Sequence, residues 1–226
     1  MDSADHAKEL AAQKALEYIS DGMIVGLGSG STSTHFIKLL GARVQKGLKI
    51  RGIASSNNSE QLAKSLSIPI IDFHATSYID ITVDGADEIA PGLALIKGGG
   101  GALLREKIVA SASKRFIVVA DSSKIVKRLG KFPLPVEVIP MASPLVAVKL
   151  AALGTRPKVR HHPDGSEYIT DEGNLILDCA CGEILDPPAL AASIRAMVGV
   201  VEHGLFLNMA DLAIVSGEHD CQLLHK

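Results

Sequence analysis

The sequence contains few aromatic residues. Phe and Tyr account for 4% of its 226 residues, and Trp is absent. Proteins that bind single-stranded nucleic acids stack bases on aromatic side chains, so the composition disfavours this class. The net charge of −2 at pH 7 also argues against a protein that binds nucleic acids or other polyanions. A small anion remains compatible with this charge because it needs only a local binding site.

Cysteine is scarce as well. The three cysteines are Cys179, Cys181 and Cys221, and such a sparse, odd number indicates a reducing compartment. The spacing of Cys179 and Cys181 places both side chains on one face of a strand, which could serve a metal ion. A second pair of Cys or His residues at ligand distance does not follow. We therefore interpret these cysteines as structural thiols and predict no metal site.

Targeting and membrane segments are also missing. The first ten residues, MDSADHAKEL, have no apolar run after a basic start, so we expect no signal peptide. The longest apolar stretches are far shorter than the ~20 residues that a membrane span requires. We therefore expect a soluble, cytoplasmic protein that does not bind membranes.

Hydrophobic residues are abundant, at 47% of the chain, and their spacing alternates between that of strands and that of helices. Near-continuous apolar strands separated by helices are typical of a mostly parallel sheet with helices on both faces. We therefore predict an α/β fold with a Rossmann-like sheet. The predicted strands span residues 23–28, 48–54, 68–73, 78–84 and 115–120, and the predicted helices span 4–20, 33–45, 56–68 and 102–113.

The pattern changes near residue 132. A proline-rich extended segment, a helix, three short strands, another helix and a strand follow in that order. This order indicates a smaller α+β domain, of the ferredoxin-like kind, inserted at residues 132–207. Residues 1–131 and 208–226 would then form the main catalytic domain, with a last buried strand at 210–217 that returns to the first sheet.

The loop GLGSGSTS, at residues 26–33, follows the first predicted strand. Its glycines permit a tight turn, and its hydroxyl groups lie beside the N–H groups that begin a helix, which suits a phosphate. The loop lacks the last glycine of a dinucleotide-binding fingerprint and the lysine of a Walker loop. A plain strand-to-helix turn is the alternative interpretation.

Carboxylates cluster in the second loop, DGADE, at residues 84–88. Asp84, Asp87 and Glu88 could perform acid–base chemistry, bind a metal ion or accept hydrogen bonds from sugar hydroxyl groups. A solvated acidic loop is the alternative. Ligands of open parallel sheets bind beyond the carboxyl ends of the strands, and the predicted strand before DGADE ends there.

Four consecutive glycines follow Lys97 in the segment KGGGGALLREK, residues 97–107. Backbone N–H groups and a fixed cation are what a developing oxyanion requires. Glu106, three residues after Leu103, borders the apolar face of the helix predicted to follow. Burial raises the pKa of a carboxyl group and makes it a better base near neutral pH. Glu106 could instead pair with Arg105, Lys107 or another surface charge.

Together these segments resemble the ribose-5-phosphate isomerases of type A. The resemblance is carried by GLGSGSTSTHF, VDGADEI, IKGGGGALLREKI, ADSSK and GKFPLPVEVIPMA, and weaker similarity extends over essentially the whole chain. It implies an enzyme of the pentose phosphate pathway that interconverts ribose 5-phosphate and ribulose 5-phosphate without a metal or organic cofactor. It also implies a homo-oligomer, either a dimer or a tetramer.

The same resemblance implies roles for individual residues. Glu106 would be the catalytic base, Lys97 would stabilise the oxyanion, and Asp84 or Asp87 would assist ring opening or hydroxyl proton transfer. The residues implied to contact the sugar phosphate are Lys8, Ser29, Gly30, Ser31, Thr32, Asp84, Gly85, Ala86, Asp87, Lys97, Gly98, Gly99, Gly100 and Lys124.

Two other classes share this kind of fold. One is a non-catalytic sugar-phosphate sensor, which would usually carry a DNA-binding helical domain ahead of the fold. The other comprises enzymes such as amino-sugar phosphate deaminases and CoA transferases. The histidines at positions 35, 74, 161, 162 and 203 show no metal-ligand spacing, and we expect them at the surface.

Overall fold

The computed structural model describes residues 3–217 and 220–226, and the chain divides into two compact units. Unit 1 comprises Met1–Ala86, Arg105–Lys124 and Asn208–Lys226, and unit 2 comprises Asp87–Leu104 and Ile125–Leu207. The chain passes from unit 2 back to unit 1 inside the helix α4, Leu103–Ser111.

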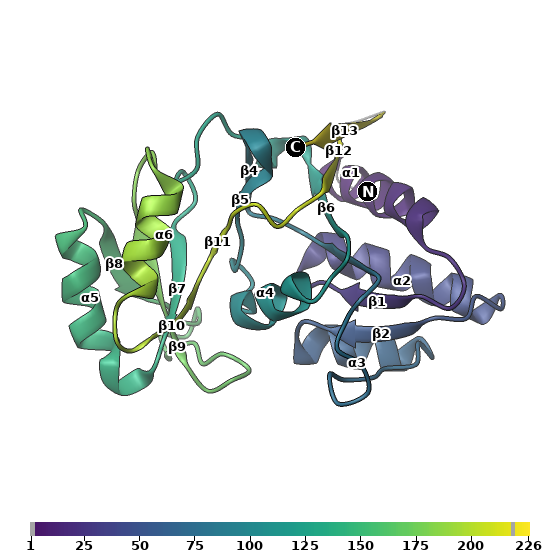
Figure 1. Ribbon diagram of the computed structural model, residues 1–226, viewed down its shortest axis with the longest axis horizontal. Coiled ribbons are helices and arrows are strands. Elements are labelled where there is room, and N and C mark those ends of the chain that lie inside the picture. The colour runs from purple at the N-terminus through teal and green to yellow at the C-terminus, as the bar shows by residue number, and fades with distance from the viewer. Residues whose placement is uncertain (1–2, 218–219) are drawn as a thin grey trace. The chain divides into compact units, whose positions relative to one another are not determined.

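Unit 1 is built on a six-stranded sheet with the order β13-β12-β6-β3-β1-β2 (Figure 1). All neighbouring pairs are parallel except β12 with β13. The strands are β1 (Ile24–Leu27), β2 (Arg51–Ala54), β3 (Ile81–Asp84), β6 (Phe116–Asp121), β12 (Leu212–Ser216) and β13 (Cys221–His225). The parallel sheet confirms the predicted α/β class.

Helices cover both faces of this sheet, as the strand pattern predicted. Val25 and Leu27 of β1 pack in one cluster with residues of α1 (Ser3–Ala15), α2 (Ser31–Gln45) and α3 (Asn57–Ser65). Ile24 points to the opposite face, where it packs with Ile53 and with Val109 of α4. The alternation arises because successive side chains of a strand project to opposite faces.

Unit 2 contains the predicted α+β arrangement. Its larger sheet has the antiparallel order β10-β7-β9-β8, and two helices pack against it through Val146, Leu150 and Ile194. The elements are β7 (Leu134–Val138), α5 (Ser143–Ala152), β8 (Arg156–Val159), β9 (Leu175–Ala180), α6 (Pro187–Arg195) and β10 (Val200–His203). This β-α-β-β-α-β order is the ferredoxin-like arrangement.

A second, three-stranded sheet in unit 2 was not predicted. Its order is β11-β5-β4, formed by β4 (Glu88–Ala90), β5 (Ala94–Ile96) and β11 (Leu205–Phe206). Ile89 also bridges Ile125. Unit 2 therefore contains residues 87–104 and 125–131 in addition to the segment 132–207 predicted as a domain. The boundaries of the inserted domain, residues 132–207, stay a prediction.

Short 3-10 helices complete the chain. They are η1 (Leu16–Tyr18) and η3 (Ser122–Lys124) in unit 1, and η2 (Pro91–Leu93) and η4 (Pro140–Ala142) in unit 2.

Two predicted strands are reduced to isolated bridges. In the segment 68–73 only Ile70 pairs, with Gly52, and in the segment 166–171 only Glu167 and Ile169 pair, with His161 and Leu175. The segment 166–171 is mostly polar, and the segment 68–73, although apolar, is too short for its pattern to determine strand pairing. Within residues 3–217 and 220–226, each helix is too short or too polar to cross a membrane.

Candidate active site

The glycine–serine loop of unit 1 connects β1 to α2. A Cβ atom on Gly28 would lie 2.2 Å from Oδ1 of Asp84, so a side chain there would displace the carboxylate. Gly30 precedes α2 and has a φ of +88°, a conformation that glycine adopts readily and other residues rarely do. The two glycines thus bring the loop against β3 and turn it into the helix.

Asp84, the last residue of β3, holds this loop. Its Oδ1 accepts hydrogen bonds from the backbone N–H of Ser29 (2.9 Å), the hydroxyl of Ser33 (3.0 Å) and the N–H of Gly85 (2.7 Å). Its side chain is buried, at 1% exposure. Because β1 and β3 are neighbours with β2 on the other side of β1, the loops meet where the strand order reverses, the usual place for a ligand in an open α/β sheet.

Hydroxyl groups from three segments gather beside this loop. The hydroxyls of Ser29 and Ser55 lie 2.9 Å apart, and Ser59 donates to the carbonyl of Gly28 at 2.6 Å. Ser31, the first residue of α2, is exposed, whereas Thr32 is buried. Ser55 and Ser59 were not predicted as part of the site.

The remaining predicted residues of unit 1 lie in four separate places. Lys8 lies on α1 and is partly exposed; Lys124 ends the short helix after β6, and is also partly exposed. Gly85 and Ala86 follow β3. Glu106 lies on α4 and is 4% exposed, so its carboxylate is buried as predicted from its position beside the apolar face.

Unit 2 carries the other predicted residues. Asp87 accepts a hydrogen bond from the N–H of Gly99 at 2.7 Å, and its own N–H donates to the carbonyl of Ile96. A Cβ atom on Gly99 would lie 2.5 Å from Oδ1 of Asp87. The acidic loop DGADE, through Asp87, and the glycine segment Gly98–Gly101 are therefore in direct contact within unit 2.

Lys97 follows β5 and is buried, at 2% exposure. Its Nζ lies 5.4 Å from the centre of the Phe206 ring, within the range of a cation–π interaction. Its backbone N–H donates to the carbonyl of Gly204 at 2.9 Å, and a Cβ atom on Gly204 would lie 2.3 Å from the carbonyl oxygen of Lys97. Gly204 thus permits the close approach of β11, a role that the sequence did not reveal.

Glu88, the third carboxylate of DGADE, has a structural role. Its two carboxylate oxygens accept hydrogen bonds from the N–H groups of Gly130 (2.7 Å) and Phe132 (2.6 Å). It is buried. Glu88 thereby satisfies backbone donors of the segment that leads into β7.

Three residues missed by the sequence reasoning hold the glycine segment from its other side. Arg160 donates from Nη1 to the carbonyl oxygens of Gly98 (2.9 Å) and Gly99 (3.1 Å), and Tyr168 donates to that of Gly100 (3.2 Å). Asp178 on β9 accepts two hydrogen bonds from the Arg160 guanidinium. No motif marks these residues, because their relation to the glycines arises from the pairing of β8 with β9.

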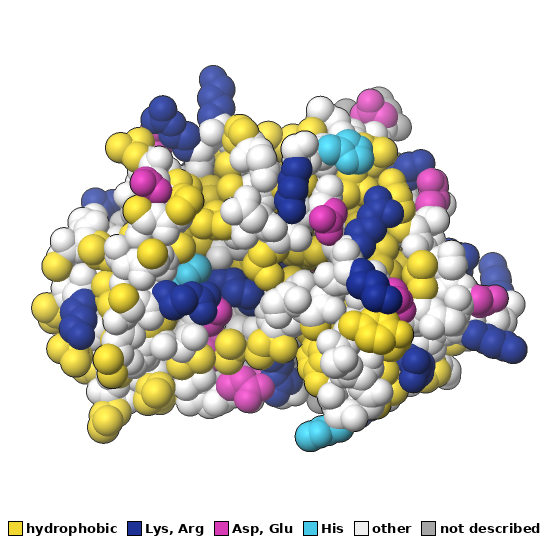
Figure 2. Space-filling model, in the orientation of Figure 1, with side chains coloured by type: hydrophobic (Ala, Val, Ile, Leu, Met, Phe, Trp, Pro, Cys, Tyr) yellow, Lys and Arg dark blue, Asp and Glu magenta, His cyan; other side chains and the backbone are white. Residues whose placement is uncertain are grey.

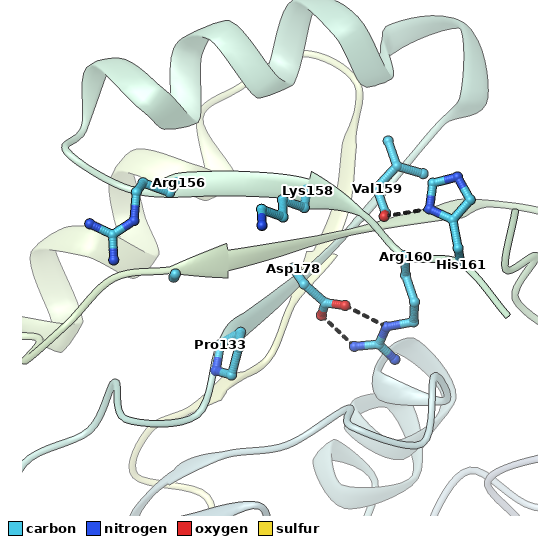
Figure 3. A pocket seen from close by; sticks show the side chains of 8 residues that line it. Pro133, Arg156, Lys158, Val159, Arg160, His161 and Asp178 are labelled. Atoms are coloured by element: carbon cyan, nitrogen blue, oxygen red, sulfur yellow. Dashed lines mark hydrogen bonds and ion pairs between the residues drawn. The ribbon is translucent and has the colours of Figure 1, made fainter. Parts of the chain in front are cut away.

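A pocket of about 600 Å³ lies along β8 and β9 of unit 2 (Figure 3). Figure 3 shows Arg160 and Asp178 pointing toward each other at one end of it, with Arg156 and Lys158 farther along β8. Its lining consists of residues outside the predicted site: Pro133, Arg156, Lys158, Val159, Arg160, His161, Asp178 and Ala180.

The predictions for histidine and cysteine have mixed outcomes. His74, His161 and His162 are exposed, but His203 is buried, so its surface placement was wrong; it lies at the end of β10, where Leu205 N–H donates to its Nδ1. Burial raises the pKa of the Cys179 thiol to about 12. The thiolate that a metal ion would require is thus disfavoured.

Comparisons with known proteins identify relatives over nearly the whole chain. The family profile described as "Ribose 5-phosphate isomerase A (phosphoriboisomerase A)" matches residues 51–220. A protein named ribose-5-phosphate isomerase A from Parvibaculum lavamentivorans is 49% identical, covering 98% of this chain and 99% of the relative. One of the same name from Caulobacter vibrioides is 49% identical, covering 94% and 95%.

Solved structures agree. A D-ribose-5-phosphate isomerase in complex with phospho-erythronic acid is 38% identical, with a TM-score of 0.96 over 99% of both chains. Ribose 5-phosphate isomerase A from Neisseria gonorrhoeae is 40% identical, with a TM-score of 0.92 over 98% of this chain and 97% of the other.

Proposed function

The chain belongs to the ribose-5-phosphate isomerase A family, and we propose that it interconverts D-ribose 5-phosphate and D-ribulose 5-phosphate. The observation that carries the proposal is its near-full-length identity to proteins named for this reaction. The reaction moves a proton between C2 and C1 of the open-chain sugar through an enediolate. It therefore needs a base, a stabiliser of negative charge and a binding site for the phosphate.

Glu106 is the proposed base. It takes the proton from C2 of the aldose and returns it to C1, which forms the ketose. Its support is its burial on α4 and its place in the IKGGGGALLREKI segment that resembles the family. A positioned base of this kind typically contributes about 10²–10⁴-fold to the rate.

Lys97 and the N–H groups of Gly98 and Gly100 are the proposed stabilisers of the oxyanion on the enediolate, since the N–H of Gly99 donates to Asp87. A buried ammonium group is effective in this role because little water competes with it. The support is the burial of Lys97 and the fixed backbone of the glycine segment, which Asp87 and Arg160 hold on opposite sides.

One of the two aspartates, Asp84 or Asp87, is proposed to serve ring opening and hydroxyl proton transfer. The two residues differ in exposure: Asp87 is partly exposed, whereas Asp84 is buried and its Oδ1 accepts three hydrogen bonds from the chain. We therefore assign proton exchange with the sugar hydroxyls to Asp87. Asp84, with Gly85 and Ala86 after it, shapes the loop that receives the substrate.

The phosphate is proposed to bind the segment Ser29–Thr32, with Lys8 and Lys124 as further contacts. The support is a glycine-rich turn at a helix N-terminus, where backbone N–H groups and the helix dipole favour an anion. The side chains of Lys8 and Lys124 supply positive charge, and both are partly exposed.

The experiment that tests the function is incubation of the purified protein with ribose 5-phosphate and detection of the ketose. We expect ribulose 5-phosphate to form without added metal and in the presence of a chelator. Tight binding of the sugar phosphate without formation of a ketose would contradict the proposal and favour a sensor.

We also propose a cytoplasmic location and a homo-oligomeric state. The three free cysteines support a reducing compartment, and cell fractionation tests it.

Exposed apolar side chains of unit 2 support self-association: Met141, Leu145 and Val148 lie before and along α5. Hydrophobic side chains are visible over this part of unit 2, at the left of Figure 2.

A further inference from the structure

We infer that Arg160 is a positioning residue for the isomerisation, which orients the peptide groups of the glycine segment toward the substrate's oxyanion. The inference rests on the proposed function, because it assigns that segment to the substrate. Arg160 itself donates to backbone carbonyl groups and is not proposed to touch the sugar. All of the contacts that carry the inference lie within unit 2.

The geometry of the Arg160 guanidinium is fixed on one side by Asp178. Nε donates to Oδ2 at 2.8 Å and Nη2 donates to Oδ1 at 2.5 Å, the two-point arrangement that suits a planar guanidinium and a carboxylate. The side chains are 12% and 27% exposed, so the pair is largely shielded from water. Lysine could not reproduce this arrangement, because its ammonium group lacks the planar fork.

The remaining amine of the guanidinium, Nη1, faces the glycine segment. It donates to the carbonyls of Gly98 and Gly99, while Tyr168 donates to the carbonyl of Gly100. The Arg160 guanidinium also lies 5.7 Å from the centre of the Tyr168 ring. Three consecutive carbonyl groups are thus held by the same pair of side chains.

Holding a carbonyl also orients the N–H group of the next residue. In a planar trans peptide the C=O and the following N–H point in opposite directions. The bond to the Gly98 carbonyl thus directs the Gly99 N–H away from Arg160, where it donates to Asp87 at 2.7 Å. By the same geometry, the bond to the Gly99 carbonyl directs the Gly100 N–H away from Arg160.

Gly100 is the residue at which this orientation matters for a ligand. It is exposed, and a Cβ atom added there would have nothing within 4 Å. A hydrogen bond from a charged donor to the carbonyl of a peptide also polarises that peptide, which strengthens its N–H as a donor. Arg160 thus supplies both the direction and the strength of the Gly100 N–H as an oxyanion donor.

The test compares steady-state kinetics of the full-length wild-type protein with Arg160→Met, which removes the charge and the donors. Displacement of a catalytic group by about 1 Å can cost about 10²-fold, so we expect kcat to fall about 10–100-fold. We expect KM to change less than about 3-fold, since the groups proposed to bind the phosphate lie elsewhere. Arg156→Met is the matched control, because Arg156 is exposed and lines the same pocket.

Phospho-erythronic acid provides a second readout. Its carboxylate presents a fixed anion, as the enediolate does, so it should report on stabilisation of the transition state. We expect Arg160→Met to raise its inhibition constant by about the same factor as kcat falls. A change in folding alone would lower the concentration of active enzyme without altering the inhibition constant.

Two conservative variants decide the outcome if Arg160→Met does not fold. We expect kcat of Arg160→Lys to fall below that of wild type, but by less than the fall expected for Arg160→Met. We expect kcat of Asp178→Asn to fall about 3–10-fold, and KM to stay nearly constant in both variants. Unchanged kcat in these variants, or a rise in KM alone, would overturn the inference. If the wild-type protein forms no ketose, the proposed function fails instead, so the two failures are distinguishable.

Discussion

The glycines of the segment Gly98–Gly101 are required for different physical reasons. Gly98 has a φ of +101°, and a Cβ atom there would lie 2.7 Å from that of Leu103. A Cβ atom on Gly99 would meet Asp87, and one on Gly101 would lie 2.1 Å from the Tyr168 hydroxyl. Of these four, only at Gly100 would an added methyl group enter open space, which agrees with the proposed approach of the substrate to its backbone.

Gly100→Ala should therefore weaken substrate binding and leave the stability of the fold unchanged. We expect KM for ribose 5-phosphate to rise about 10-fold or more, because a methyl group would occupy the space in which the sugar approaches the backbone. The midpoint of thermal unfolding should stay within about 2 °C of wild type, since a surface substitution usually changes stability by less than about 0.5 kcal/mol.

Gly217→Ala is the control for this variant. Its added Cβ atom would make an ordinary contact of 3.5 Å with Asp220, and its φ lies outside the left-handed region. Equal KM values for wild type, Gly217→Ala and Gly100→Ala would contradict the placement of substrate at Gly100.

At this scale the sequence located the glycine and acidic segments but not the residues that hold them, and the catalytic roles stay predictions. The glycine run was interpreted as a source of backbone donors for an oxyanion, and within it only Gly100 has open space beside its Cα atom. Arg160, Tyr168 and Gly204 were missed because their relation to the glycine segment depends on strand pairing between residues distant in sequence.

At the scale of elements, β7 carries a buried carboxylate. Oε1 of Glu137 accepts hydrogen bonds from the Thr170 hydroxyl and the Asn174 amide, both at 2.9 Å. Burial raises the pKa of Glu137, against the lowering effect of these two hydrogen bonds. The folded state therefore binds the proton of Glu137 more tightly than the unfolded state does.

The sign of the resulting pH dependence follows from linkage. The contribution of Glu137 to stability is fully present below the ordinary glutamate pKa of 4.5, and it is lost as the pH rises through the raised pKa of the folded state. Glu137→Gln keeps Oε1 as a hydrogen-bond acceptor but has no carboxyl group that titrates. We expect the variant to unfold about 2–4 °C higher than wild type at pH 8, which corresponds to about 1 kcal/mol at this chain length.

Thermal unfolding measured between pH 4 and pH 8 checks this prediction. The difference between Glu137→Gln and wild type should shrink as the pH falls toward 4. The exposed Glu167, replaced by Gln, is the control and should show no such trend. A lower unfolding temperature for Glu137→Gln at pH 8 would show that its charge stabilises the fold.

Most elements could be predicted from periodicity alone. The helices α2 and α4 and the strands β1, β3 and β6 have long or fully apolar patterns, which a single sequence reveals well. The hairpin of β4 and β5 was missed because each of its strands has three residues. The segment around Ile70 was overpredicted because a short apolar run does not by itself determine strand pairing.

At the scale of the whole molecule, the order of elements was the most informative feature. The order of strand, helix, three short strands, helix and strand predicted a ferredoxin-like arrangement. The structure confirms the arrangement through the order β10-β7-β9-β8, with two of the three short strands formed as β8 and β9. The extent of unit 2 could not be predicted in the same way, because residues 87–104 join it through the pairing of β5 with β11.

Self-association is the prediction that belongs to this scale. Met141 and Val148 are 91% and 70% exposed, and exposed apolar side chains that gather in a patch are typical of an interaction surface. We expect Val148→Lys to lower the mass measured by sedimentation, and Leu223→Lys on β13 to leave it unchanged. A wild-type mass equal to one 23.7 kDa chain would contradict the homo-oligomer.

The assignment of Glu106 as the base is the central claim, and Glu106→Gln tests it most directly. The substitution keeps the shape of the side chain and removes its ability to accept a proton. Steady-state kinetics with ribose 5-phosphate should show kcat lowered by about 10²–10⁴-fold, with KM within about 3-fold of wild type and an unchanged unfolding temperature. Glu17→Gln, at an exposed glutamate, should retain full activity. A folded Glu106→Gln protein with kcat near that of wild type would contradict the account.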